Sequence, residues 1–284
     1  MLNIKFLLIL LLIITLILLI INCFNKDSFK NQSVKSLIIV GCARDCGKYL
    51  PKVLNKIKEL AKNKKIYFIF YENDSKDNTN QILQNFVNEI NNKNNDNYKA
   101  HLISEKLYIK RRTPRIAHCR NQILKYIMNN NLIDEYDFYI NMDLDDVNIN
   151  LNVESVNKCL HEENKWDIAS ISQSKYYYDT WALRTQLKND NSAGVLKNFN
   201  KWFINIPKIK NLNYIPVKMS YIPVISAFGG FTIYKTYLLN NSWYTGEDKN
   251  NSKLDECEHV NFHKNILTNF PKTRFYIIPY MTND

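Results

Sequence analysis

The first half of the chain alternates short apolar runs with amphipathic helical runs, and this alternation constrains the fold more than any other feature. The apolar runs are rich in β-branched and aromatic residues and end in polar segments, as strands do. Strands are expected at 36–41, 66–71, 102–105 and 137–142, and helices at 48–63, 80–90 and 117–128. This order indicates an α/β fold with a mostly parallel sheet flanked by helices. Ligands of such sheets bind beyond the carboxyl ends of the strands, so the loops that follow the strands are the candidate functional segments.

Ahead of this alternation, an apolar run at 6–21, interrupted only by Thr15, predicts one N-terminal membrane-spanning helix. The residues before Cys23 are bulky rather than small, which argues against cleavage and favours an uncleaved anchor. We therefore divide the chain into an anchor at 1–24, a polar stem at 25–35 and one catalytic domain at 36–284.

Two features give opposite expectations for the orientation of this anchor. Lys26, Lys30 and Lys35 follow the span, which favours a cytosolic domain by the positive-inside tendency. A very short N-terminal tail before a large domain is instead the usual layout of type II enzymes. We expect the type II orientation, with the domain in the lumen of the endoplasmic reticulum or Golgi, and leave the cytosolic orientation open.

Composition limits the classes of partner and cofactor. The formal net charge of +11 suits an anionic ligand such as a nucleotide diphosphate. The lysines at 52–65 are spaced as on a solvated helix face, so no nucleic-acid partner is expected. The 6 cysteines are widely separated and lack zinc-ligand spacing, which excludes a disulfide-framework protein and a zinc site.

The acidic segment Asp143-Leu-Asp145-Asp146 follows the last of the expected strands. Alternate side chains of an extended segment share a face, so the carboxylates of Asp143 and Asp145 are expected to converge. Paired carboxylates bind Mg²⁺ or Mn²⁺, whose coordination is completed by phosphate oxygens of a substrate. The alternative is a solvated acidic turn.

A second acidic segment, at 71–79, lies between an expected strand and an expected helix. Its carboxylates, from Glu72, Asp74 and Asp77, are candidates to accept hydrogen bonds from a nucleotide base or ribose. The alternative for Asp77 and Thr79 is that they cap the following helix, and the two roles are compatible.

Read together, these segments resemble the GT-A glycosyltransferases. The motifs are Glu72-Asn-Asp-Ser-x-Asp-x-Thr, Arg120-Asn121 and Asp143-x-Asp145-Asp146. The more specific resemblance is to fungal capsule-type α-1,3-mannosyltransferases and family-2-like glycosyltransferases of algae and large viruses. It extends through 112–117, 177–184, 227–231 and 257–263. It implies a Rossmann-like GT-A fold, a nucleotide-sugar donor and a divalent cation.

The resemblance also implies a donor site. Guanidinium groups suit diphosphate oxygens, with a structural ion pair as the alternative for each arginine. A glycine pair lets the backbone approach a sugar closely, with a strand bulge as the alternative. The donor set is Arg44, Glu72, Asp74, Asp77, Arg112, Arg115, Arg120, Asn121, Asp143, Gly229 and Gly230.

This chain departs from the family pattern in the second acidic segment. Related sequences carry two acidic residues where it has Glu72-Asn73, and glycine where it has Asp74. The base-contacting residue is therefore open between Glu72 and Asp74.

Two acids are candidates for catalysis. Glu258 occupies the position where related inverting enzymes carry a general base, and Asp146 adjoins the metal motif. A base at Glu258 suggests inversion at the anomeric carbon, whereas the mannosyltransferase resemblance suggests retention, so the stereochemical outcome stays open.

The remaining candidates lie in the second half of the chain. His263 follows His259 by four residues on an expected helix and is a candidate third metal ligand, with ordinary packing as the alternative. Asp179, Trp181 and Arg184 combine a carboxylate, an aromatic face and a cation, which suits an acceptor sugar. Core packing is the alternative for Trp181.

The predicted function is transfer of a hexose, with mannose the sugar that the resemblance suggests, from a nucleotide-diphosphate sugar. The acceptor is a hydroxyl group of a glycan, glycoprotein or glycolipid, and the reaction depends on Mn²⁺ or Mg²⁺. A metal-dependent nucleotidyltransferase or phosphotransferase would share the acidic motif. A catalytically inactive, membrane-anchored sugar-binding module would bind sugar without turnover.

Overall fold

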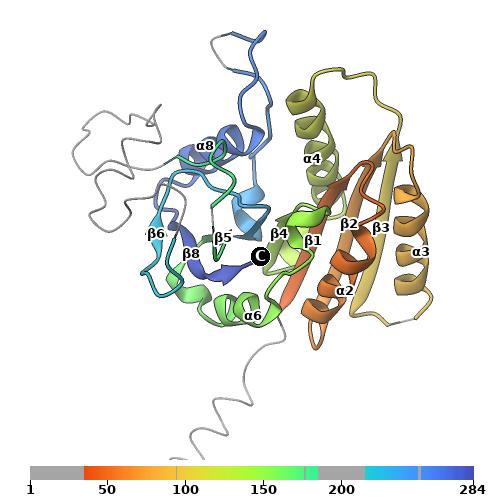
Figure 1. Ribbon diagram of the computed structural model, residues 1–284, viewed down its shortest axis with the longest axis horizontal. Coiled ribbons are helices and arrows are strands. Elements are labelled where there is room, and N and C mark those ends of the chain that lie inside the picture. Colours follow the sequence, from red (N-terminus) through yellow and green to blue (C-terminus); the bar gives the residue numbers. More distant parts are fainter. Residues whose placement is uncertain (1–34, 94, 176, 185–214, 249–250) are drawn as a thin grey trace, which may run out of the picture. The chain divides into compact units, whose positions relative to one another are not determined.

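The computed structural model describes residues 35–93, 95–175, 177–184, 215–248 and 251–284 (Figure 1). The predicted anchor, and the predicted stem up to residue 34, lie outside the described residues. None of the helices within the described ranges is both long enough and apolar enough to cross a membrane.

One eight-stranded sheet, in the order β3-β2-β1-β4-β7-β5-β8-β6, organises the described chain. The strands are β1 (Ser36–Ala43), β2 (Lys65–Asn73), β3 (Tyr98–Glu105), β4 (Phe138–Met142), β5 (Ile168–Ser172), β6 (Ile222–Pro223), β7 (Phe231–Lys235) and β8 (Phe275–Thr282). β1 to β4 pair in parallel, whereas β7 is antiparallel to both β4 and β5. The prediction of a mostly parallel sheet is therefore confirmed for the first four strands and corrected for the whole: the sheet is mixed.

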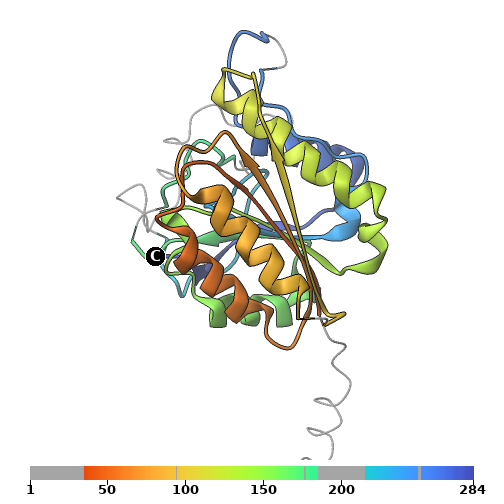
Figure 2. The ribbon, with the colours of Figure 1, turned by 90° about the vertical axis from the view of Figure 1, so that its right-hand side faces the viewer.

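Helices cover both faces of this sheet (Figure 2). They are α2 (Leu50–Ala61), α3 (Thr79–Asn91), α4 (Arg112–Asn129), α5 (Leu132–Glu135), α6 (Val153–His161) and α8 (Glu258–Asn269), with 3-10 turns η1 (Asp146–Asn148), η2 (Glu163–Lys165) and η3 (Thr236–Leu239). α2, α3 and α6 belong to one buried cluster, and α4 and α8 to a second. The domain thus has three layers, with the sheet in the middle.

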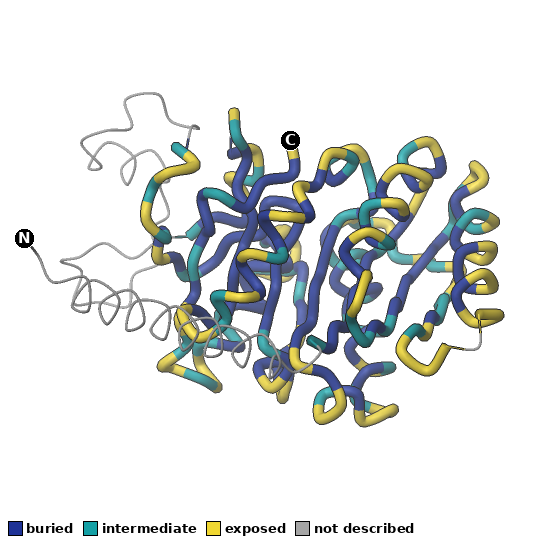
Figure 3. The backbone as a smooth tube through the Cα atoms, turned by 90° about the horizontal axis from the view of Figure 1, so that it is seen from below, coloured by how far each residue is buried: buried dark blue, intermediate teal, exposed yellow. Residues whose placement is uncertain are grey.

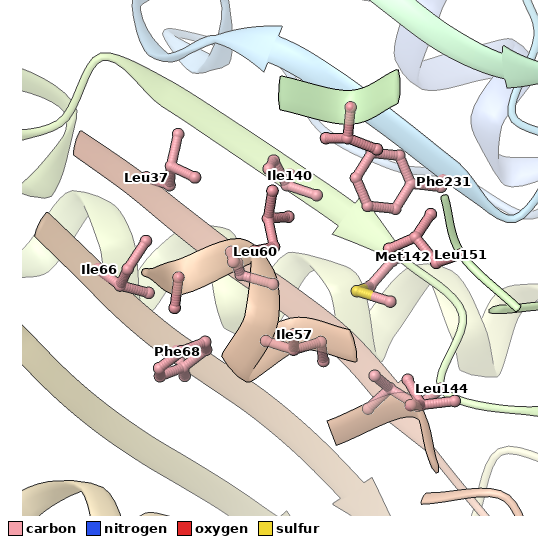
Figure 4. Close-up of a cluster of buried hydrophobic side chains, with 14 of the residues drawn as sticks. Leu37, Ile57, Leu60, Ile66, Phe68, Ile140, Met142, Leu144, Leu151 and Phe231 are labelled. Carbon is pink, nitrogen blue, oxygen red and sulfur yellow. The ribbon is translucent and has the colours of Figure 1, made fainter. Parts of the chain in front are cut away.

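The apolar pattern of β1 explains why both faces are covered. Leu37 and Ile39 enter the cluster that contains Ile57 of α2 (Figure 4), whereas Ile38 and Val40 enter the cluster that contains Ile123 of α4. Successive side chains of a strand point to opposite faces, so a continuous apolar run is buried on both sides. Figure 3 shows the result: apart from the edge strand β3, the long strands are buried along most of their length, and exposed residues lie on the outer sides of the helices.

Helix α4 begins five residues earlier than expected, at Arg112 rather than at 117. Pro114 lies in its first turn, where a missing N–H is tolerated. This early start places Arg112, Arg115 and Arg120 on one helix and so determines the geometry of the pocket described next.

Candidate active site

A pocket of about 250 Å³ lies where β1, β2 and β4 end and α4 begins. Residues from the ends of the three strands and from one face of α4 line it: Cys42, Ala43, Arg44, Cys46, Asn73, Arg112, Arg115, Ile116, Cys119, Arg120, Asp143, Leu144 and Asp145. The helical contributors each have another contributor three or four residues away, as expected for one helix face. The pocket therefore lies at the strand ends, where the sequence placed the candidate functional segments.

The two predicted metal ligands, Asp143 and Asp145, both line this pocket. Asp143 is anchored through its backbone N–H, which donates to the Gly230 carbonyl at 2.9 Å. Burial raises the pKa of Asp143 to about 7; Arg120 opposes this shift and Asp145 adds to it. Burial also raises the pKa of Asp145, whose Oδ1 accepts a hydrogen bond from Val147 N–H at 3.3 Å. Burial and the proximity of the two carboxylates therefore disfavour negative charge on this pair.

Arg120 is the buried cation of this pocket. Its Nη2 lies 3.6 Å from Asp143 Oδ1, and its Nε lies 3.4 Å from Glu258 Oε1. The guanidinium also stacks over the rings of Phe228 and Tyr244, at 5.0 and 5.7 Å from the ring centroids. Burial disfavours its charge, but Glu258 and Asp143 raise its pKa overall. Within the described chain its buried Nη1 has no hydrogen-bond partner, and its Nε has only the ion-pair contact with Glu258.

The two acids predicted to be catalytic differ in exposure. Glu258 begins α8, is 5% exposed and does not line the pocket, because it lies against Arg120. Asp146 begins η1, is exposed, and lines a neighbouring hollow instead.

The prediction that His263 ligates a metal is wrong in this structure. Its Nδ1 lies 2.9 Å from Ser226 Oγ and its Nε2 lies 2.8 Å from Tyr234 OH, so both ring nitrogens are occupied. The ring is fully buried, and burial lowers its pKa to about 3. In the described part of the chain, no group of three or more His, Cys, Asp and Glu residues is arranged to hold a metal ion. The packing alternative is the correct one for His263.

The second acidic segment holds its own loop together. Glu72 accepts hydrogen bonds from Ser75 N–H and from the side chains of Asn80 and Ser104, at 2.9, 2.7 and 2.8 Å. Burial alone would raise its pKa, but these hydrogen bonds lower it below the usual value. None of the predicted nucleotide contacts Glu72, Asp74 and Asp77 lines the pocket.

The two aspartates of this segment have local partners. Asp77 Oδ1 accepts from the backbone N–H of Thr79, the first residue of α3, at 2.9 Å, although the N-cap residue of this helix is Asn78. Asp74 has a positive φ of 52° and accepts from the backbone N–H of Leu107 at 3.1 Å. Asn73, which sequence reasoning passed over, is the residue of this segment that reaches the pocket.

Asn121 does not reach the pocket. Its side chain donates to the Tyr244 carbonyl and accepts from the Tyr244 N–H, both at 2.9 Å. Its amide therefore ties the 244 segment to α4, which corrects the prediction that it contacts the donor.

The glycine pair Gly229-Gly230 contacts the backbone of Asp143, whose N–H donates to the Gly230 carbonyl. Both glycines have positive φ, 62° for Gly229 and 82° for Gly230. A Cβ atom on Gly230 would lie 2.5 Å from Val147 Cγ1 and 2.9 Å from the Tyr178 hydroxyl. Glycine is required here because the backbone approaches these neighbours closely.

Of the three predicted acceptor residues, Trp181 is exposed, whereas Asp179 and Arg184 have partners within the protein. Trp181 is 45% exposed, so the core-packing alternative is wrong and its ring is open to solvent. Asp179 accepts hydrogen bonds from Ala182 N–H and Gly229 N–H, and burial raises its pKa to about 6. Arg184 is committed elsewhere: it pairs with Glu256 at 3.1 Å and donates to the Trp181 carbonyl at 2.8 Å.

Sequence reasoning missed one further residue beside the acidic pair. The Tyr178 hydroxyl lies 3.5 Å from Asp143 Oδ2. The available signal was its place in the tyrosine-rich block at 177–184, directly before Asp179.

Comparison with known proteins gives one match at the level of a family. The family model described as cryptococcal mannosyltransferase 1 matches residues 36–265. No curated protein sequence matches the chain.

Solved structures of low sequence identity are also similar. S. aureus TarS 1-349 is 18% identical over 86% of this chain, with a TM-score of 0.45. The mannosyltransferase PcManGT from Pyrobaculum calidifontis, in complex with GDP-Man and Mn2+, is 9% identical over 87% of this chain, with a TM-score of 0.48. The matches cover 58% and 57% of those two chains, so this chain spans less than two thirds of their length.

Proposed function

We propose that this chain, which belongs to the cryptococcal mannosyltransferase 1 family, transfers a hexose from a nucleotide-diphosphate sugar to a hydroxyl group of an acceptor. The resemblance favours mannose as the sugar and a GT-A type of domain. The observation that carries the proposal is one pocket in which Asp143 and Asp145 lie together with four arginines, Arg44, Arg112, Arg115 and Arg120.

The arginines suit the diphosphate of the donor. Guanidinium groups bind phosphate oxygens through paired N–H donors, and such bonds are stronger when both partners are charged. Arg120 Nη1 has no hydrogen-bond partner among the described residues, and the guanidinium is held in place by Glu258 and Phe228. A fixed donor in a buried site stabilises the charge that develops on the leaving diphosphate without reorganising.

Asp143 and Asp145 fit a hard divalent cation. Two carboxylates in one pocket, with substrate phosphate oxygens as further ligands, match the preference of Mg²⁺ and Mn²⁺. The raised pKa of Asp143 supports this fit, because a cation would compensate the charge that burial disfavours. Such a cation, when bound, would neutralise the diphosphate leaving group.

The reaction breaks the bond between the anomeric carbon and the diphosphate oxygen, and the electron pair leaves with the diphosphate. The acceptor oxygen forms a new bond to the anomeric carbon and loses its proton. Of the two acids considered for this proton, Asp146 is exposed, whereas Glu258 is buried against Arg120. We assign the proton to Asp146 and a positioning role to Glu258, which holds Arg120.

The test is turnover by the purified full-length chain in detergent, with a panel of GDP- and UDP-sugars and with Mn²⁺ present or absent. We expect metal-dependent turnover of one donor, which Asp143→Asn and Asp145→Asn reduce at least a hundredfold. Asp134→Asn, at an exposed position of α5, is the matched control and should leave turnover unchanged.

The products separate the alternatives. A glycosyltransferase releases the nucleoside diphosphate, a nucleotidyltransferase releases diphosphate or a nucleotide adduct, and a sugar-binding module releases nothing. Folded protein that neither turns over nor binds any nucleotide by calorimetry would contradict the proposal.

The membrane anchor at 1–24 and the lumenal orientation also stay proposals, supported by the apolar run at 6–21. Resistance of the full chain to carbonate extraction, with protection from added protease in intact microsomes, is the expected result. Protease sensitivity in intact microsomes would instead place the domain in the cytosol.

A further inference from the structure

A second hollow, of about 330 Å³, opens beside the donor pocket. It is built from η1, from the segment after β5 and from the segment after β8. Its lining includes Asp146, Val147, Asn150, Lys175, Tyr178 and Asp284. Nothing in the donor chemistry described above uses this hollow.

Tyr178 separates the hollow from the donor pocket. It lines the hollow, and its hydroxyl lies 3.5 Å from Asp143 Oδ2, a carboxylate that lines the donor pocket. The acidic segment spans the same boundary, because Asp145 lines the pocket and Asp146 lines the hollow. A molecule in the hollow would therefore lie next to the site of the leaving diphosphate.

Buried amides connect the floor of the hollow to the donor pocket. Gln173 Nε2 donates to Asn283 Oδ1 at 2.9 Å, and Asn283 Nδ2 donates to Asn148 Oδ1 at 2.9 Å. Asn148 Nδ2 then donates to the carbonyl oxygens of Asp143 and Gly230, both at 2.8 Å. All three amide side chains are buried, so the hollow and Asp143 are held in one rigid arrangement.

The chemistry of the lining selects the class of ligand. Two carboxylates, Asp146 and Asp284, outnumber the one ammonium group, Lys175, so an anion is disfavoured. The 47%-exposed Tyr178 offers a ring face for sugar C–H groups, and Asn150 offers both a donor and an acceptor for hydroxyl groups. The lining suits a neutral sugar better than a phosphate or a nucleotide.

We propose that this hollow binds the acceptor as a neutral sugar unit and that Tyr178 directs its reactive hydroxyl toward the donor pocket. The inference rests on the proposed transferase function and adds the acceptor subsite to it. It also explains why Asp146 lines this hollow rather than the donor pocket.

The experiment measures acceptor and donor KM separately, with the full chain, the donor identified above and methyl α-mannoside as the first acceptor probe. Asn150→Ala, Lys175→Ala and Tyr178→Ala should each raise the acceptor KM about tenfold. The donor KM should change less than twofold in Asn150→Ala and Lys175→Ala, whose side chains do not contact Asp143. Asn129→Ala and Lys125→Ala, at exposed positions of α4, are the matched controls.

Three outcomes oppose the inference in different ways. An unchanged acceptor KM in all three variants would remove the acceptor from this hollow. A rise in donor KM, with donor hydrolysis reduced in parallel, would show that the hollow holds the donor's own sugar. Absence of turnover in the unsubstituted chain would instead defeat the proposed function, before any variant is compared.

Discussion

The Nη2 atom of Arg120 lies 3.6 Å from Oδ1 of Asp143, and the same guanidinium approaches Glu258 at 3.4 Å. One buried cation is thus shared between a carboxylate of the donor pocket and a carboxylate of the interior. Removal of Arg120 should affect both the stability of the domain and the binding of the donor.

For stability, Arg120→Met should lower the free energy of unfolding by about 3–5 kcal/mol, because Glu258 is left buried without a cation. Adding Glu258→Gln to this variant should restore part of the loss, because the uncompensated charge disappears. Urea denaturation followed by fluorescence measures both. Arg112→Met, at an exposed position of the same helix, is the control; an equal loss there would mean that the buried ion pairs are not the cause.

Gly230→Ala should destabilise the domain by about 1–3 kcal/mol, since the residue has a φ of 82° and a Cβ would meet Val147. Activity should fall further than the loss of stability explains. The backbone at 230 must shift to accommodate the Cβ, and its carbonyl, which accepts from Asp143 N–H, would shift with it. Gly47→Ala offers the comparison: its added Cβ meets side-chain atoms of Asn78 and Asp77, which can move. Activity assayed well below the melting temperature separates the two effects, and full activity there would contradict the second.

His263 should make the domain less stable in acid. Its folded-state pKa of about 3 lies below the usual 6.5, so at intermediate pH the unfolded chain binds a proton that the folded chain does not. Stability is therefore present above pH 6.5 and is lost as the pH falls toward 3, by up to about 1.4 kcal/mol per pH unit.

His259, whose pKa burial also lowers, should add a second proton to this linkage. In His263→Gln, the free energy of unfolding should depend less steeply on pH, because one proton fewer is bound on unfolding. Urea denaturation between pH 4 and 7, a range set by the pKa shift of His263, measures this slope. His118→Gln, at a half-exposed position of α4, serves as the control. An unchanged slope in the first variant would show that His263 is protonated in the folded state.

Trp181→Ala should raise the acceptor KM about three- to tenfold, because the exposed ring offers a face for sugar stacking. The free energy of unfolding should change by less than about 0.5 kcal/mol, because the ring is exposed. Trp243→Ala removes another partly exposed tryptophan, one that lies outside the block at 177–184, and should leave the acceptor KM unchanged. Equal effects of the two substitutions on the acceptor KM would argue against a specific role for Trp181.

The strands, helices and pocket residues of the first half of the domain could largely be predicted from the sequence. The apolar runs of β1, β2 and β4 are continuous because both faces of these strands are buried, and parallel strands place their ends at one edge. The placement of Asp143, Asp145 and Arg44 around one pocket followed from that rule. The second half was harder to predict, because β5, β7 and β8 pair across long sequence separations, including the antiparallel β7.

The sequence by itself determined the alternation of strands and helices, the acidic pair after β4 and the family of the chain, because these depend on local periodicity and short motifs. Only the tertiary structure decided which polar side chains are free to meet a ligand. His263 and Asn121 have the right chemistry, but their polar atoms are already hydrogen-bonded to Ser226, Tyr234 and Tyr244. Tyr178 reaches Asp143 across 35 residues of sequence, and no local pattern records such a contact, because it is made by the packing of distant segments.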